Sequence, residues 1–219
     1  MDDDSSFMMK TILFDLDGTL VDNFEAIHQS YQYTQEKLDL PAASYDKVKQ
    51  TVGGSVPITM RRLLGEAFTE AAIPLFVEHF KKHFHVGLRL LPGARELLEA
   101  LQQSGEYQMA VFTNKNHEIS QKVCEHLGIT SFFRAIEGAE RPEGYRKPNR
   151  DFSEHVLRKM NADPQSTWMI GDSPFDAQAA QVVNLADVYL VATGSHSSQE
   201  LQDETSTYGI FPEIGRAHV

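Results

Sequence analysis

Hydrophobic runs alternate with amphipathic stretches along most of this chain. Five runs are apolar enough to predict buried strands: Thr11–Phe14, Met109–Phe112, Arg134–Ile136, Thr167–Ile170 and Asp187–Val191. Helical patterns separate the last four of these strands, and apolar residues also recur at helical spacing over 94–101, after Pro92-Gly93. Strands that alternate with helices predict an α/β fold with a mostly parallel, five-stranded sheet and helices on both faces.

The segment from Asn23 to Leu88 breaks this rhythm, because it has helical stripes but no convincing strand. Pro57 and Pro74 are expected to open helices within it. We interpret the segment as a helical module inserted after the first strand. The core is therefore expected to comprise residues 8–22 and 89–219, and the helical cap residues 23–88.

Two of the helical patterns make local predictions. The pattern at 177–183 ends at Asn184, a residue type that tolerates the left-handed conformation of a helix C-terminus. The pattern at 119–127 includes Cys124, the one cysteine of the chain, which excludes an internal disulfide. We expect this thiol to be buried in a helix.

Composition limits where the protein works and what it binds. The formal net charge is −11, to which Asp2-Asp3-Asp4 of a predicted solvated tail contribute, so nucleic acid and anionic membranes are unfavourable partners. No apolar run approaches the roughly 20 residues that a bilayer-spanning helix needs, and the N-terminus lacks a signal-peptide pattern. We expect a cytoplasmic monomer or homodimer with a small-molecule partner.

The strongest chemical signal follows the first predicted strand, where Asp15 and Asp17 flank Leu16 ahead of Gly18. If the backbone stays extended, alternation places both carboxylates on the same side. Two carboxylates that lie so near each other favour different roles. One is held ionised as a nucleophile, while its neighbour holds or passes a proton. This pairing is typical of enzymes that form an aspartyl phosphate.

Three later motifs supply the other parts that such an enzyme needs. Thr113-Asn114-Lys115 ends the second predicted strand, Lys147-Pro148 precedes a helix, and Gly171-Asp172-Ser173-Pro174-Phe175-Asp176 ends the fourth strand. Open α/β sheets bind ligands beyond the carboxyl ends of their strands, which is where these motifs fall. A Mg²⁺ ion held by Asp15, Asp172 and a backbone carbonyl would offset the acidic charge near a phosphate substrate.

With these four motifs in this order, the chain resembles the haloacid dehalogenase-like superfamily, specifically its phosphatases with a helical cap inserted after the first motif. The resemblance implies a Rossmann-like core whose first strand is central, between the strands that carry Thr113 and Asp172. It makes Asp15 the nucleophile and Asp17 the general acid and base. It also implies phosphate binding by Thr113, Asn114, Lys147 and Gly18, metal binding by Asp15, Asp17 and Asp172, and support of the metal or of Lys147 by Asp176.

The resemblance also narrows the reaction. Family members that act on carbon–halogen bonds lack an equivalent of Asp17, so its presence favours phosphate esters. The Leu-Pro-Gly-Ala stretch before the second motif, and Thr113-Asn114-Lys115 itself, look most like phosphoglycolate phosphatases and their relatives. We therefore expect a Mg²⁺-dependent phosphatase that hydrolyses a small phosphorylated metabolite. The alternatives are a phosphosugar mutase and, in another class, a non-catalytic binding or regulatory protein on the same fold.

Within the predicted cap, Gly53-Gly54-Ser55 and Arg61-Arg62 are the candidates for contact with the substrate, with Gly53, Gly54 and Arg61 favoured. The glycines would let the turn approach the core closely, and the arginine could pair with a carboxylate on the substrate. An ordinary turn and a solvated helix face are the competing interpretations. Asp22 is interpreted as a helix cap in preference to a catalytic group.

Overall fold

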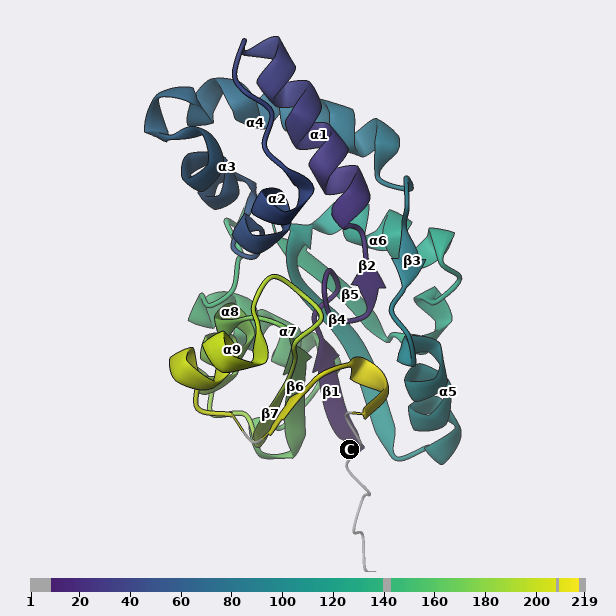
Figure 1. Ribbon diagram of the computed structural model, residues 1–219. Coiled ribbons are helices and arrows are strands. Elements are labelled where there is room, and N and C mark those ends of the chain that lie inside the picture. Colours follow the sequence, from purple (N-terminus) through teal and green to yellow (C-terminus); the bar gives the residue numbers. More distant parts are fainter. Residues whose placement is uncertain (1–8, 140–142, 208, 217–219) are drawn as a thin grey trace, which may run out of the picture.

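A computed structural model describes residues 9–139, 143–207 and 209–216, so the predicted acidic tail lies outside the described residues. Within them, six strands form one parallel sheet in the order β5-β4-β1-β6-β7-β8 (Figure 1). These strands are β1 (Lys10–Phe14), β4 (Tyr107–Asn116), β5 (Ala135–Ala139), β6 (Thr167–Gly171), β7 (Asp187–Val191) and β8 (Gly209–Phe211). The predicted α/β class with a parallel sheet is thus confirmed, with one strand more than expected.

Strand β1 occupies the middle of the sheet, hydrogen-bonded to β4 on one side and β6 on the other. Ile12, Leu13 and Phe14 are each no more than 1% exposed. A parallel strand covered on both faces must be apolar at consecutive positions, which explains the unbroken Ile-Leu-Phe run.

Helices cover both faces of this sheet. On the face of Ile12 and Phe14 lie α5 (Ala94–Ser104) and α6 (His117–His126), whereas α7 (Arg150–Met160) and α8 (Pro174–Gln181) pack on the face of Leu13. Helix α9 (Ser198–Glu204) contributes Leu201 to a smaller apolar cluster beside β7. Short 3₁₀ turns complete the core: η1 (Thr130–Phe132), η2 (Pro164–Ser166) and η3 (Ile214–Arg216).

The inserted segment forms four helices, which Figure 1 shows gathered beyond the end of β1. They are α1 (Phe24–Lys37), α2 (Tyr45–Thr51), α3 (Val56–Leu64) and α4 (Glu66–His83). Two short strands, β2 (Val21–Asp22) and β3 (Arg89–Leu90), carry the chain into and out of them as an antiparallel pair. We refer to α1–α4 as the cap.

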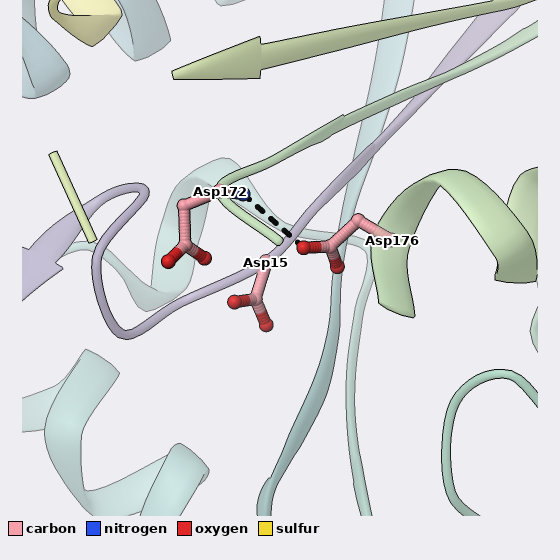
Figure 2. A group of neighbouring side chains, drawn as sticks. All are labelled: Asp15, Asp172 and Asp176. Carbon is pink, nitrogen blue, oxygen red and sulfur yellow. Dashed lines mark hydrogen bonds between the residues drawn. The ribbon is translucent and has the colours of Figure 1, made fainter. Parts of the chain in front are cut away.

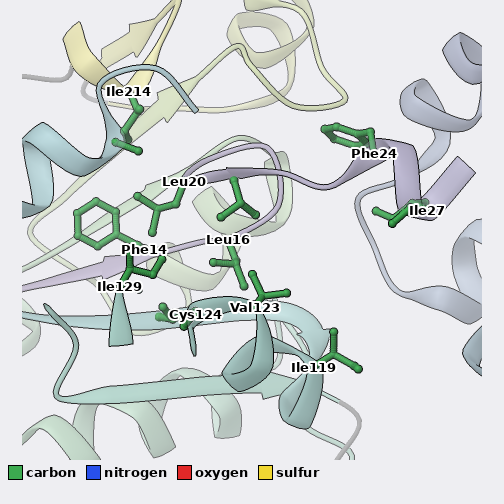
Figure 3. Close-up of a cluster of buried hydrophobic side chains, with 14 of the residues drawn as sticks. Phe14, Leu16, Leu20, Phe24, Ile27, Ile119, Val123, Cys124, Ile129 and Ile214 are labelled. Atoms are coloured by element: carbon green, nitrogen blue, oxygen red, sulfur yellow. The ribbon is translucent and has the colours of Figure 1, made fainter. Parts of the chain in front are cut away.

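Apolar packing continues from the core into the cap. Phe24 and Ile27 of α1 belong to the same buried cluster as Phe14 of β1 and Ile119 of α6, and Figure 3 shows the side chains of this cluster. The buried cluster thus extends from the sheet into the cap, and Phe24, Ile27 and Ile119 also line a cavity that includes Asp15 at the end of β1.

The predictions for single residues in and near the helices had different outcomes. Asn184 has a φ of 53°, which confirms the left-handed conformation at that helix end, and Cys124 is fully buried in α6. Pro57 lies in the first turn of α3 as expected, but Pro74 lies inside α4 and does not open a helix. Helix α4 continues through Pro74 because Ala72 and Phe76, on either side of it, are buried against the rest of the cap. None of the described helices is long and apolar enough to cross a membrane.

Candidate active site

The four motifs meet at the carboxyl edge of the central strands. Asp15 follows β1 directly, Thr113 lies near the end of β4, and Asp172 follows β6. Because β1 pairs in parallel with both β4 and β6, these three ends lie side by side. The backbone N–H of Asp15 donates to the carbonyl of Ile170 over 2.9 Å, which extends the β1–β6 pairing up to the first catalytic candidate.

Lys147 joins the motifs electrostatically. Its Nζ lies 3.0 Å from Asp15 Oδ1 and 2.9 Å from the carbonyl oxygen of Phe112, and it also donates to Asp176 Oδ1. The residue is only 3% exposed. Burial by itself would lower the pKa of this ammonium group, but Asp15 and Asp176 overcome that effect and raise the pKa. Lys147 therefore stays protonated beside the carboxylate of Asp15.

Asp176 is a positioning residue, because both oxygens of its carboxylate accept hydrogen bonds from other groups of the protein. Oδ2 accepts hydrogen bonds from the backbone N–H groups of Asp172 (3.1 Å) and Ser173 (3.0 Å) and from Ser173 Oγ (2.7 Å), while Oδ1 accepts from Lys147. These bonds cap the N-terminus of α8. Asp176 thus orients Lys147 and holds the loop that presents Asp172.

Two glycines make room for the Asp172 carboxylate. A Cβ atom on Gly194 would lie 1.6 Å from Asp172 Oδ2, and one on Gly18, which has a φ of +83°, would lie 2.6 Å from it. Thr19 Oγ1 donates to Asp172 Oδ1 over 3.3 Å. The cradle of Asp172 accepts no side chain larger than glycine at either position.

This corner of the molecule suits a divalent cation with a preference for oxygen ligands. One carboxylate oxygen from each of Asp15, Asp172 and Asp176 lies within 4.8 Å of the other two, and Figure 2 shows the three side chains converging. Burial, followed by the neighbouring Asp15 and Asp176, raises the pKa of Asp172 well above its usual value. Buried carboxylates this close together repel, and a hard cation relieves the repulsion. Asp15 and Asp172 could act as ligands, because Asp176 is already filled by other donors.

Asp17 is paired with a lysine that the motif analysis had not singled out. Lys115 Nζ lies 2.7 Å from Asp17 Oδ2 and 4.7 Å from the centre of the Phe80 ring in the cap. Burial raises the pKa of Asp17, and Lys115 opposes that rise. Asp17 Oδ1 is buried without a hydrogen-bond partner among the described residues, and Asp17 lines the cavity beneath the cap. Asp17 thus lies at the cavity with one carboxylate oxygen paired with Lys115 and the other unpaired among the described residues.

The predicted phosphate-binding residues divide into two groups. Thr113 is 2% exposed and, like Lys147, lines the cavity beside Asp15. The side chain of Asn114 instead bonds both backbone groups of Lys147, accepting from its N–H over 2.6 Å and donating to its carbonyl over 3.1 Å. Asn114 therefore positions Lys147, and Gly18 makes room for Asp172.

The predicted substrate-binding residues of the cap also differ in their positions relative to the cavity. Gly53 and Gly54 line the cavity, and a Cβ on Gly53 would approach Ser195 Oγ of the core to 3.2 Å. Arg61 does not line the cavity; its side chain is 56% exposed and pairs with Glu66. Asp22 accepts the N–H of Phe24 at the start of α1 and pairs with Arg89, in keeping with a structural role.

Sequence reasoning assigned no role to several residues that shape this site: Thr19, Lys115, Gly194 and Ser195. Lys115 and Thr19 stand within or beside quoted motifs, so adjacency was the available signal. Gly194 acts only through the space it leaves for Asp172, and single-sequence patterns carry no trace of such a role.

Comparison with known proteins agrees with this geometry. The sequence profile of the haloacid dehalogenase-like hydrolases matches residues 12–189, and the chain belongs to this family. The prediction of an enzyme of the phosphoric monoester hydrolase class is thereby confirmed.

Individual relatives span nearly the same length. A phosphoglycolate phosphatase of Aquifex aeolicus is 30% identical over 79% of this chain and 80% of its own length. That of Chromobacterium violaceum is 31% identical over 82% of this chain and 84% of its own. A solved haloacid dehalogenase-like protein of Streptococcus pneumoniae superposes with a TM-score of 0.84 and 25% identity, covering 94% of this chain and 95% of its own. The similarity to these proteins thus extends over most of the chain, and the fold is shared with the solved structure.

Proposed function

We propose that the protein is a Mg²⁺-dependent phosphatase that hydrolyses a small phosphate monoester through an aspartyl phosphate on Asp15. The observation that carries this proposal is the position of Asp15 Oδ1, 3.0 Å from the buried ammonium of Lys147 and beside the carboxylate of Asp172. An ionised carboxylate at this edge is placed to attack a phosphorus atom whose oxygens Lys147 and Thr113 bind.

Two displacements complete the cycle. In the first, an oxygen of Asp15 forms a bond to phosphorus while the bond to the alcohol oxygen breaks, and Asp17 gives that oxygen its proton. In the second, Asp17 takes a proton from a water molecule whose oxygen attacks phosphorus, and the bond to Asp15 breaks to release phosphate. The raised pKa of Asp17 supports the first role, because a buried carboxyl group retains a proton more readily.

A magnesium ion bound by Asp15 and Asp172, together with the backbone carbonyl of Asp17, would neutralise charge on the phosphate oxygens. The chain's own contribution is to hold Asp172 in the Gly18–Gly194 cradle and to hold Lys147 through Asp176 and Asn114.

Phosphoglycolate is the first compound to test, because the relatives from Aquifex aeolicus and Chromobacterium violaceum carry the name phosphoglycolate phosphatase. A mutase would use the same aspartyl phosphate but transfer the phosphoryl group to a second hydroxyl group. A purely binding protein would release no phosphate. Measurement of inorganic phosphate distinguishes the three functions.

The decisive experiment measures phosphate release by wild-type protein and by Asp15→Asn, each with Mg²⁺ and with a chelator. We expect Asp15→Asn to lower the rate by about 10⁴-fold or more, because an amide is a poor nucleophile. The exposed Asp203→Asn, on α9, is the matched control and should retain full activity.

A trapping experiment identifies the intermediate. Borohydride reduction of acid-quenched enzyme should change the mass of the peptide containing Asp15. Unimpaired turnover by Asp15→Asn, or labelling of another residue, would refute the proposal.

A further inference from the structure

The cavity between the cap and the catalytic residues has a volume of about 120 Å³. Asp15, Asp17 and Lys147 form its floor, and its walls come mainly from apolar side chains of the cap and of α6. Among them are Phe24 and Ile27 of α1, Val77 and Phe80 of α4, and Ile119 of α6. For comparison, a dry apolar cavity of about 150 Å³ is large enough to bind benzene. The group that leaves with the alcohol oxygen must therefore enter mostly apolar surroundings.

Positive charge is scarce on the described walls of this cavity. Lys147 is held by Asp15 and Asp176, and Lys115 is held by Asp17. Lys81, the remaining lysine among the lining residues, is exposed. A carboxylate on the alcohol would have to draw Lys115 away from Asp17 or turn toward Lys81. Burying an anion without a partner is strongly unfavourable.

On the cap side of the cavity, the neutral hydrogen-bonding side chains are those of Tyr31, Ser55 and Thr59, whereas the core side also presents Thr113, Asn114, Asn116, Ser173 and Ser195. Ser55 Oγ is buried and has no partner among the described residues, and Ser55 lines the cavity. The hydroxyl of Tyr31 is engaged with Thr59. The hydroxyl groups of a sugar that extend from the core side toward the cap would meet mainly apolar side chains there, which disfavours the mutase alternative. One polar atom beside Ser55 and an otherwise apolar body fit this wall.

We infer that the preferred substrates are phosphate monoesters of uncharged, mainly apolar alcohols, either aliphatic or carrying one ring, and that these are preferred to carboxylate-bearing esters such as phosphoglycolate. This inference rests on the proposed phosphatase activity and names the alcohol half of its substrate. Val77 and its neighbours on α1 and α4 determine the specificity.

A homologous series of primary alkyl phosphates, from ethyl to hexyl, tests the inference directly. Their leaving alcohols are almost equally basic, so differences in kcat/KM report binding of the chain. We expect kcat/KM to rise about fourfold per buried methylene group until the cavity is full. Benzyl phosphate should be hydrolysed more efficiently than phosphoglycolate. A flat series, or a preference for phosphoglycolate, would overturn the inference while leaving the phosphatase proposal intact.

A variant locates the effect in the cap. Val77→Thr keeps the side-chain shape but places a hydroxyl group on the cavity wall, and should lower the ratio of hexyl to ethyl phosphate kcat/KM roughly fivefold. Leu75→Thr, on the same helix but outside the cavity, is the control and should leave the ratio unchanged. Equal ratios in all three proteins would also count against the inference.

Binding of non-hydrolysable alkyl phosphonates separates the two proposals if turnover fails. Titration calorimetry with ethyl and hexyl phosphonate in the presence of Mg²⁺ should show tighter binding of the longer chain. Affinity that rises with chain length, without phosphate release, would reject the hydrolase and keep the apolar site. Affinity independent of chain length would reject the apolar site.

Discussion

The side chains of Lys147 and Asp176 have protein partners for their hydrogen bonds, whereas at the cavity beneath the cap Ser55 Oγ and Asp17 Oδ1 have none among the described residues. The first region is a charged corner fixed by short contacts between distant parts of the chain. The second is an apolar space closed by helices. A preorganised corner can perform one reaction well, while an apolar space discriminates between alcohols by size and polarity. Reaction and selectivity are therefore built by different segments and should respond to different substitutions.

Among substitutions that spare the proposed nucleophile and proton donor, the largest effect is expected from loosening the charged corner. Asp176→Asn keeps the size of the side chain but removes its charge and one of its two acceptor oxygens, so either Lys147 or the donors of Asp172 and Ser173 lose their acceptor. We expect activity to fall about 100-fold. Urea unfolding should show a loss of about 3 kcal/mol, because the pair with Lys147 is buried.

The control for this substitution is Glu154→Gln, which removes partly exposed pairs with Arg150 and Arg158. Its effect on the free energy of unfolding should stay within about 0.5 kcal/mol. If Asp176→Asn behaved like Glu154→Gln, Asp176 would not position the site.

An intermediate effect is expected from filling the cradle of Asp172. Gly194→Ala would place a methyl group 1.6 Å from the present position of Asp172 Oδ2, so that carboxylate must move. The Mg²⁺ concentration needed for half-maximal activity should rise about tenfold. The measurement is a Mg²⁺ titration of phosphate release.

Gly105→Ala separates steric displacement from general strain. Gly105 has a φ of +69° and open space around it, so this variant should lose about 1 kcal/mol of stability without a change in the Mg²⁺ requirement. Equal Mg²⁺ requirements in both glycine variants would contradict the proposed role of Gly194.

A last prediction concerns the apolar packing between α6 and the sheet, and no effect on phosphate release is expected from it. Burial raises the pKa of the Cys124 thiol to about 12, so very little thiolate exists at pH 8. Iodoacetamide should modify native protein at least about 100-fold more slowly than protein in urea, as followed by mass spectrometry. Rapid modification of the native protein would show that water enters the packing between α6 and the sheet.

The reactive corner was predictable from sequence because its residues follow apolar strands directly. Asp15, Thr113 and Asp172 each come at or just beyond a buried strand end, and parallel pairing then brings them together. The unbroken apolar runs also gave the sheet, apart from β8, whose three residues Gly209–Phe211 are too short to stand out. The sheet and the residues at its strand ends can therefore be predicted from a single sequence.

Side-chain contacts between residues that are distant in the sequence could not be predicted from local patterns. Lys115 meets Asp17 across 98 positions, and Asn114 meets Lys147 across 33, so local patterns give no sign of either pair. Arg61 was selected for its charge, but its position on α3 places it with Glu66 and outside the cavity. A proline such as Pro74 is typical of a helix start, but packing on both sides of it keeps α4 continuous.

The antiparallel pairing of β2 with β3 has a topological consequence. Asp22 and Arg89, where the chain enters and leaves the cap, lie opposite each other in register. For the core, the whole cap is thus equivalent to the loop of one long hairpin, and the parallel sheet is assembled without any strand from it. Such an arrangement lets the inserted segment be lengthened, shortened or exchanged during evolution while β1, β4 and β6 keep their register. New alcohol specificities can then arise on an unchanged catalytic core.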